Sequence, residues 1–136
     1  SGSKTKLEDR LHQIRKQLLH ANPNPQPSER GAQRALSAAK IVSLLEAFED
    51  LIQGRDAYYL DANITKPLTK PFGLSFAELA GNQVVTFFVS HFWGNAFQKT
   101  VAAIRKHAEH AVRTCLQLQG QDWRSLAYWL CFLSNN

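Results

Sequence analysis

The chain has 136 residues, of which 44% are hydrophobic and 20% charged, a composition typical of one globular domain. Every apolar run is shorter than the roughly 18 residues of a membrane-spanning helix, so no transmembrane segment is expected. The formal net charge of +5 comes from 16 basic and 11 acidic residues, and the basic residues form no block, which disfavours nucleic acid as the partner.

The N-terminus and the cysteines indicate the cellular compartment. Residues 1–5 are polar and predict no signal peptide, and we expect them to be disordered or to derive from a tag. Cys115 and Cys131 lie on apolar faces of predicted elements, so we expect two buried thiols and no disulfide. The sequence therefore predicts an intracellular, cytoplasmic protein.

Residues 6–54 predict a hairpin of two helices. For the first helix, Thr5 and Glu8 match a capping box, and apolar side chains follow at helical spacing up to about His20. Three prolines within residues 22–27 end this helix, because proline cannot continue the backbone hydrogen bonds.

The second helix of the hairpin is expected from Glu29 to about Gln53. Ser28 is its predicted N-cap, and Gly54 ends it. Apolar residues at helical spacing form its predicted buried side, namely Leu36, Ala39, Leu44, Leu45, Phe48, Leu51 and Ile52.

The third region, residues 55–83, is predicted to be an irregular segment with one short helix. Pro67 and Pro71 favour an extended loop across the surface. Ser75 and Glu78 match a second capping box, which predicts a short helix directly after this loop.

Residues 84–136 predict one βαβ unit, so the fold class is α/β. An apolar strand over 84–90 is followed by an amphipathic helix from about 95 to 119 and a second apolar strand over 125–134. This order implies parallel strands with a right-handed connection. Because both strands are continuously apolar, we expect the sheet to be covered on both faces, with the N-terminal helical hairpin as one cover.

The candidate functional site is the turn that follows the strand over 84–90. Ser90, His91, Trp93, Gly94 and Asn95 lie where ligands of α/β proteins bind, between the carboxyl end of a strand and the next helix. His91 is the candidate general acid or base and Trp93 a candidate stacking surface. The backbone N–H groups of residues 94–96, at the start of the predicted helix, are a candidate phosphate site. In the alternative interpretation His91 and Trp93 only fix the turn. No catalytic group is assigned.

No metal site is expected either. His107 and His110 lie three residues apart on the predicted central helix, but they point in different directions and no third ligand is evident. We expect a solvated pair of surface histidines.

The same C-terminal residues resemble a known family. Residues 84–136 resemble the first strand, first helix and second strand of TIR domains, whose opening strand is an apolar run that often ends in Ser-His, as at Ser90 and His91. The S-H-x-W-G motif, together with Tyr128–Cys131 and the final Asn135–Asn136, is similar to that of TIR-like proteins from algae and other protists.

This resemblance implies a flavodoxin-like module that either assembles with other TIR domains or hydrolyses NAD. In the hydrolases the essential glutamate lies on a helix beyond the second strand, and no residue of this chain matches it. The resemblance therefore carries over only the strand-end position at Ser90, His91 and Trp93. It implies NAD or another nucleotide as a ligand, whereas the residues themselves require no cofactor.

Three functions from different classes stay open at this point. The favoured one is a non-catalytic interaction or scaffold module that self-associates or binds a protein partner through an open sheet edge. The second is a fragment of an NAD- or nucleotide-processing TIR-like enzyme, which would need residues beyond Asn136. The third is an accessory subunit of a larger assembly. Because only two residues follow the last predicted strand, we expect an incomplete domain.

Overall fold

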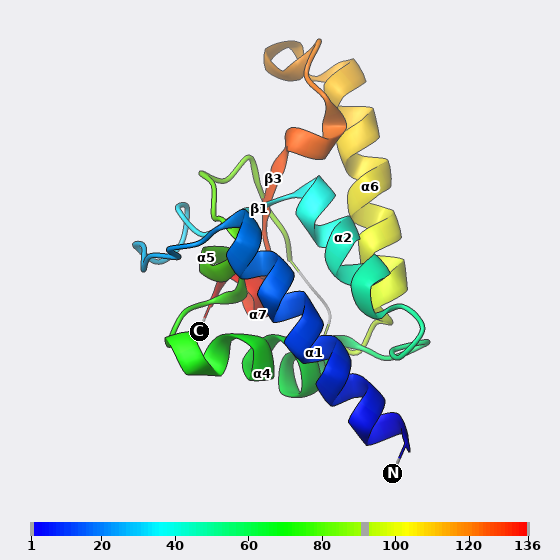
Figure 1. Ribbon diagram of the computed structural model, residues 1–136. Helices are drawn as coiled ribbons and strands as arrows, with labels where there is room; N and C mark the ends of the chain where they lie inside the picture. Colours follow the sequence, from blue (N-terminus) through cyan, green and yellow to red (C-terminus); the bar gives the residue numbers. More distant parts are fainter. Residues whose placement is uncertain (1, 91–92, 136) are drawn as a thin grey trace.

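A small mixed sheet of three strands joins the two halves of the chain (Figure 1). The computed structural model describes residues 2–90 and 93–135, and of residues 2–5 only the backbone. In spatial order the strands are β1 (Leu36–Ser37), β3 (Ala127–Trp129) and β2 (Phe87–Phe88). The central strand, β3, is antiparallel to β1 and parallel to β2.

Two groups of helices flank this sheet. On the right of Figure 1, α2 (Ala38–Phe48) packs against α6 (Phe97–Thr114). The other group lies to the left and below, with α1 packed against α4 and α5, and α5 packed against α7. Its helices are α1 (Gly2–Ala21), α3 (Ala57–Leu60), α4 (Lys66–Thr69), α5 (Phe76–Ala80) and α7 (Cys131–Ser134). Among the described residues, no helix combines the length and the apolar character that a membrane span requires.

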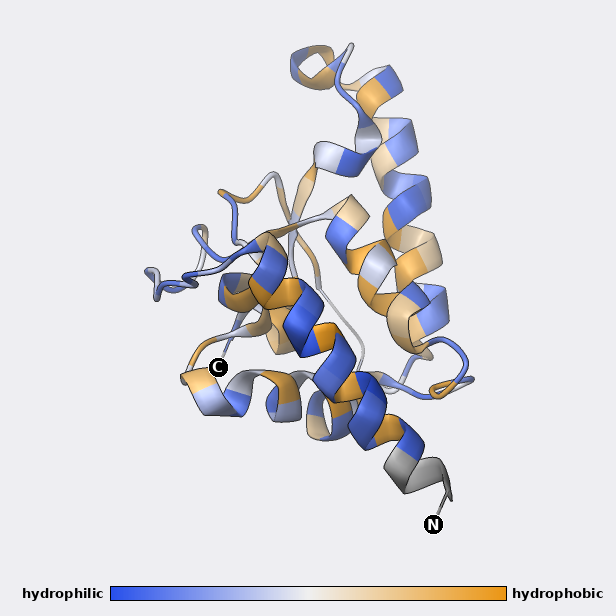
Figure 2. Ribbon diagram, in the orientation of Figure 1, coloured by the Kyte–Doolittle hydropathy of each residue, from blue (hydrophilic) through white to orange (hydrophobic). Residues whose placement is uncertain are grey.

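The predicted parallel pairing across the C-terminal half is confirmed. Phe87 of β2 lies opposite Tyr128 of β3, and α6 connects the two strands. The apolar stripe predicted for the central helix is buried at Phe97, Val101, Ile104, Ala108 and Ala111. Figure 2 shows the hydrophobic residues of α6 turned toward α2, so this stripe forms the contact between the two helices.

The second helix is shorter than predicted, and Ser28 is not its N-cap. α2 begins at Ala38, and the side chain of Ser37 accepts a hydrogen bond from the backbone N–H of Lys40. The preceding residues bend instead, and Gly31 has a φ of 84°, a left-handed conformation that a helix cannot contain. The predicted hairpin is therefore interrupted by β1.

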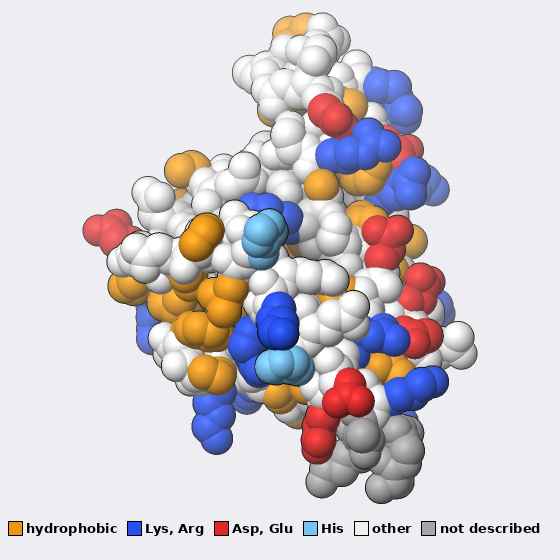
Figure 3. Space-filling view, in the orientation of Figure 1, with side chains coloured by type: hydrophobic (Ala, Val, Ile, Leu, Met, Phe, Trp, Pro, Cys, Tyr) orange, Lys and Arg blue, Asp and Glu red, His pale blue; other side chains and the backbone are white. Residues whose placement is uncertain are grey.

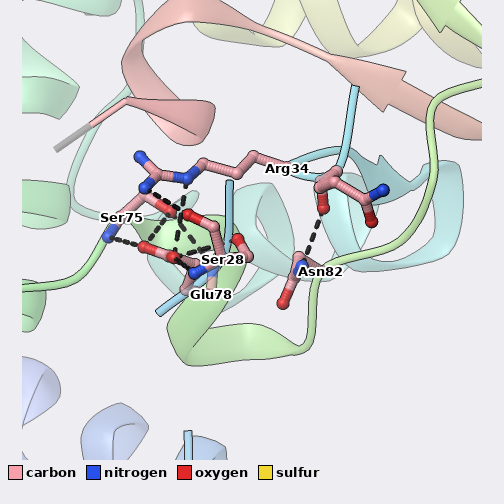
Figure 4. A network of polar contacts seen from close by, with 6 residues as sticks. Ser28, Arg34, Ser75, Glu78 and Asn82 are labelled. Carbon is pink, nitrogen blue, oxygen red and sulfur yellow. Dashed lines mark hydrogen bonds and ion pairs between the residues drawn. The ribbon is translucent and has the colours of Figure 1, made fainter. Parts of the chain in front are cut away.

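Ser28 instead belongs to a buried polar cluster around Glu78 (Figure 4). The Glu78 carboxylate, 1% exposed as a residue, accepts hydrogen bonds from the backbone N–H and hydroxyl groups of both Ser28 and Ser75. The Nε of Arg34 lies 3.5 Å from the same carboxylate. Burial alone would raise the pKa of Glu78, but the hydrogen bonds from Ser75 and Ser28 outweigh it and lower the pKa below its ordinary value. The capping box predicted at Ser75 is confirmed as part of this cluster.

The region predicted to be an extended loop is helical instead. α3 continues through a π-helical turn over Asp61–Thr65 into α4, and a 3-10 turn ends the segment at Phe72. Asp56 caps its start by accepting the N–H of Tyr59 at 3.0 Å. Pro67 is the second residue of α4, just after the π-helical turn, where the regular hydrogen-bond ladder is already interrupted and the missing proline N–H costs little.

Two arginines hold α1 in place against its neighbours. Arg10 donates to the carbonyl of Ala47 at 2.7 Å and pairs with Asp50, so it binds the C-terminal end of α2. Arg15 donates to the carbonyl of Pro67 at 2.7 Å. Both N-terminal helices thus join the globular body, with α1 covering α4 and α5 while α2 covers α6.

Both predicted C-terminal strands are shorter than expected. The chain leaves β3 after Trp129 and forms α7, where the Ser134 hydroxyl accepts the N–H of Leu130 at 3.2 Å. The expectation that the sheet is covered on both faces is wrong for the predicted strand over 84–90, because Val84 and Phe88 are exposed, whereas Ala127 and Tyr128 of β3 are buried. The two cysteines are free thiols and are half-buried rather than fully buried.

Candidate functional site

A cavity of about 540 Å³ lies between the end of β2 and the first half of α6. The β2 segment and Tyr128 of β3 form one wall, and α6 forms the other. The lining residues are Phe87, Phe88, Val89, Ser90, Asn95, Lys99, Thr100, Ala103, Ile104, His107 and Tyr128. This is the crevice beside the carboxyl end of a parallel strand, where α/β proteins bind their ligands.

Of the four predicted site residues that the structure describes, two line this cavity. Ser90 follows β2 and Asn95 precedes α6, and both are exposed to solvent. His91 lies outside the described residues, so its candidate role as general acid or base stays a prediction.

Trp93 is placed differently and packs into the protein beneath the turn. Its ring lies 5.1 Å from that of Tyr58 and 5.7 Å from that of Phe132. Its backbone carbonyl accepts the N–H of Ala57 at 3.1 Å. Trp93 therefore connects the turn to α3 and α7, and the exposed Gly94 follows it outside the cavity.

The start of α6 is tied to the segment that precedes α3. Ala96 forms a β-bridge with Asp56, and the N–H of Phe97 donates to the carbonyl of Arg55 at 2.9 Å. The first amide of the helix is thus already occupied by protein. A ligand anion in the cavity would meet the side chain of Lys99, which lies in the first turn of α6.

A contact between His107 and Tyr128 was missed by the sequence analysis. The Nδ1 atom of His107 lies 2.8 Å from the Tyr128 hydroxyl, and the Phe87 ring meets the imidazole edge-on with centroids 4.6 Å apart. Burial raises the pKa of Tyr128 to about 12, so the phenol is protonated at neutral pH. His107 is exposed but not a purely solvated residue as predicted. The feature that brings these two residues together is the pairing of β2 with β3, whose register sets Tyr128 beside Phe87.

The charge of the cavity favours a ligand that carries hydrogen-bond acceptors. Lys99 is the one charged side chain among its described lining residues, and none of these residues is a carboxylate. The other polar lining groups include the hydroxyl and amide groups of Ser90, Asn95 and Thr100. The apolar lining includes Phe87, Ala103 and Ile104. Such a site fits an apolar group with an acidic or carbonyl oxygen attached.

A solvent-exposed apolar surface, called here the outer face of β2, consists of Phe88, which also lines the cavity, and Val84 in the segment that leads into the strand. Exposure alternates along residues 84–90, and these two side chains are 64% and 62% exposed. Phe88 lies against Trp129 of β3, with ring centroids 5.7 Å apart. The indole Nε1 of Trp129 is buried and has no hydrogen-bond partner among the described residues. Two exposed apolar side chains, Val84 and Phe88, and a buried donor without a described partner therefore occur in this part of the sheet.

Other parts of the chain offer less defined sites. A cavity of about 790 Å³ lies beside α4 and α5 and is mostly apolar, with Lys66 and Lys70 among its lining residues. Within residues 2–90 and 93–135, no group of three or more His, Cys, Asp or Glu residues is arranged to hold a metal ion.

Comparison with known proteins found no relative. No family model matches the chain, and neither the curated proteins nor the solved structures gave a match. The function must therefore be argued from the site itself.

Proposed function

We propose that this chain is a non-catalytic protein-interaction module that binds an extended segment of a partner protein along β2. The observation that carries this proposal is the outer face of β2 and of the segment before it: Phe88 of β2, the outermost described strand on that side of the sheet, and Val84, three residues before the strand, are both more than half exposed. An edge strand accepts a further strand through its backbone groups, and exposed apolar residues gain by being covered.

The chemistry around β2 defines the kind of segment that fits. One apolar side chain of the partner would occupy the cavity over Phe87 and Ile104, and an acidic side chain would meet Lys99. Along an extended segment, side chains alternate between faces, so one face can fill the cavity while the other contacts solvent. On the face shown in Figure 3, basic and acidic side chains are intermixed, which favours a protein partner over nucleic acid.

The resemblance of residues 84–136 to TIR domains supports the same function, because many such domains act by assembly. A flavodoxin-like origin of the β2–α6–β3 unit is part of this proposal, as is an intracellular location, which the two free thiols support.

Selection of binding peptides tests the proposal. We expect a displayed library of random ten-residue peptides to yield binders in which apolar residues alternate and one acidic residue recurs. Their binding to the isotope-labelled chain should shift the NMR signals of backbone amides in residues 85–90 and in the first half of α6. Shifts confined to α1 or to the helical segment at 57–72 would contradict the proposal.

Self-association is a separate outcome of the same study. Sedimentation of the chain alone shows whether a second copy covers β2. If the chain forms a dimer that Phe88→Glu disrupts, the partner that covers β2 is a second copy of this chain rather than another protein.

A second candidate function is binding of NAD or another nucleotide in the same cavity. Lys99, the hydroxyl groups of Ser90 and Thr100, and an aromatic wall at Phe87 and Phe88 favour it. Addition of NAD should then shift the amide signals of Ser90, Asn95 and Lys99, and Lys99→Ala should abolish these shifts. Since no residue matches the essential glutamate of the TIR hydrolases, we expect no release of nicotinamide. Release that is lost in His91→Ala would make the chain an enzyme.

A further inference from the structure

Lys40 is a lysine on the first turn of α2 whose amine points into the protein. Its Nζ donates a hydrogen bond to the carbonyl of Gly81, which ends α5, at 2.9 Å. The residue is half-buried, and none of the ion pairs formed among the described residues involves it. A lysine amine that is partly withdrawn from water without a carboxylate partner is uncommon, because one carbonyl replaces only part of the hydration that the ammonium ion loses.

The Lys40 side chain lines a cavity of about 210 Å³ between α1, α2 and α5. Lys40 is the one ionisable group among the described lining residues, and the walls are mainly apolar. The cavity is lined by Ile14, Gln17, Leu18, Ala21, Lys40, Ser43, Leu44, Ala47, Phe76 and Ala80. An apolar cavity of about 150 Å³ is large enough for a benzene ring, so a small ring or short chain fits here.

Burial changes the chemistry of this amine. It lowers the pKa of Lys40 below the ordinary value of 10.5, so a larger share of the amine is neutral near neutral pH than for a solvated lysine. A neutral amine in an apolar pocket is the nucleophile that proteins use to form Schiff bases with carbonyl compounds.

We propose that Lys40 is a covalent capture site for small apolar aldehydes, whose ring or chain occupies the cavity between α1, α2 and α5. The lone pair of the neutral amine attacks the carbonyl carbon and a C–N bond forms. The carbonyl oxygen takes up one proton from the amine and one from solvent, and it leaves as water as the C–O bond breaks and the C–N double bond forms. The product is an iminium ion, and no electrons are transferred. Its N–H donates to the Gly81 carbonyl in place of the lysine ammonium. This site is independent of the interaction proposed for β2.

Reductive trapping tests the proposal on the full chain. Benzaldehyde is the probe, cyanoborohydride traps the iminium ion, and peptide mass mapping measures the labelling rate at each lysine. We expect Lys40 to be labelled about fivefold faster than the exposed Lys6 and Lys16, because its amine is less protonated and the cavity holds the ring. With glyoxylate, a charged aldehyde that an apolar cavity does not favour, this advantage should disappear.

Two variants serve as controls. Lys40→Arg keeps a donor for Gly81 and should remove only the fast labelling. Ala47→Leu fills the cavity from α2 but leaves the amine in place, so the preference for benzaldehyde should be lost while labelling of Lys40 by glyoxylate persists. The proposal is overturned if benzaldehyde labels Lys40 no faster than Lys6 and Lys16 in the unmodified sequence, or if the preference survives Ala47→Leu.

Discussion

The Glu78 cluster and the outer face of β2 both contain residues that join distant parts of the chain. They differ in whether the buried polar groups have hydrogen-bond partners. Glu78 is buried with four hydrogen bonds from two serines, so a charge that is costly to bury is matched by donors. At β2, Phe88 is exposed and the Trp129 indole N–H is buried without a partner among the described residues. The first region matches its buried charge with donors, whereas the second leaves an apolar side chain exposed and a buried donor without a partner among the described residues.

The largest effect that this comparison predicts is the loss of stability in Glu78→Ala. The change leaves Arg34 and the amides of Ser28 and Ser75 without the carboxylate, and we expect a cost of about 3–5 kcal/mol in the free energy of unfolding. Urea unfolding followed by circular dichroism measures it. A cost below about 1 kcal/mol would mean that water replaces the carboxylate and that the cluster is not a stabilising element.

A smaller effect is expected in acid. The pKa of Glu78 is lower in the folded chain than its ordinary value of 4.5, so its contribution to stability is complete above that value. The contribution falls as the pH drops from 4.5 through the folded-state pKa. The difference in stability between the natural sequence and Glu78→Gln should therefore shrink in acid, and a difference independent of pH would contradict the assignment.

Tyr128→Phe should have a modest effect at the boundary between core and site. It removes the hydroxyl that contacts Nδ1 of His107 and keeps the ring packed beside Phe87, so we expect a cost of about 1 kcal/mol. Thermal unfolding of the variant measures this cost. If stability is unchanged, the exposed imidazole exchanges the phenol for water without penalty.

Sequence patterns predicted those parts of the fold that depend on local signals. The amphipathic stripe of α6, the capping box at Ser75 and the parallel pairing of β2 with β3 follow from spacing and order along the chain. The helical segment after Asp56 was missed, since Pro67 favours a loop unless a π-helical turn precedes it. The end of the last strand was missed because an apolar run is equally compatible with a short buried helix such as α7.

The candidate site was only partly predictable for a similar reason. Its position at the end of β2 follows from the strand–helix order, and Ser90 and Asn95 were found in this way. The contact between His107 and Tyr128 joins residues 21 positions apart, and only the register of two short strands brings them together. The exposure of Phe88 was missed as well, because an uninterrupted apolar strand predicts burial on both faces.

The most direct test of the interaction proposal is the affinity of a selected peptide for Phe88→Glu compared with Leu116→Glu. Leu116 is also an exposed apolar residue, 80% exposed, but it lies beyond the end of α6 and away from the cavity. Both variants should keep the stability of the natural sequence within about 0.5 kcal/mol, because neither side chain is buried. Fluorescence polarisation should show binding weakened about tenfold or more by Phe88→Glu, which loses an apolar contact at the centre of the proposed interface, and unchanged by Leu116→Glu. Equal affinity of the two variants would contradict the assignment of β2 as the binding surface.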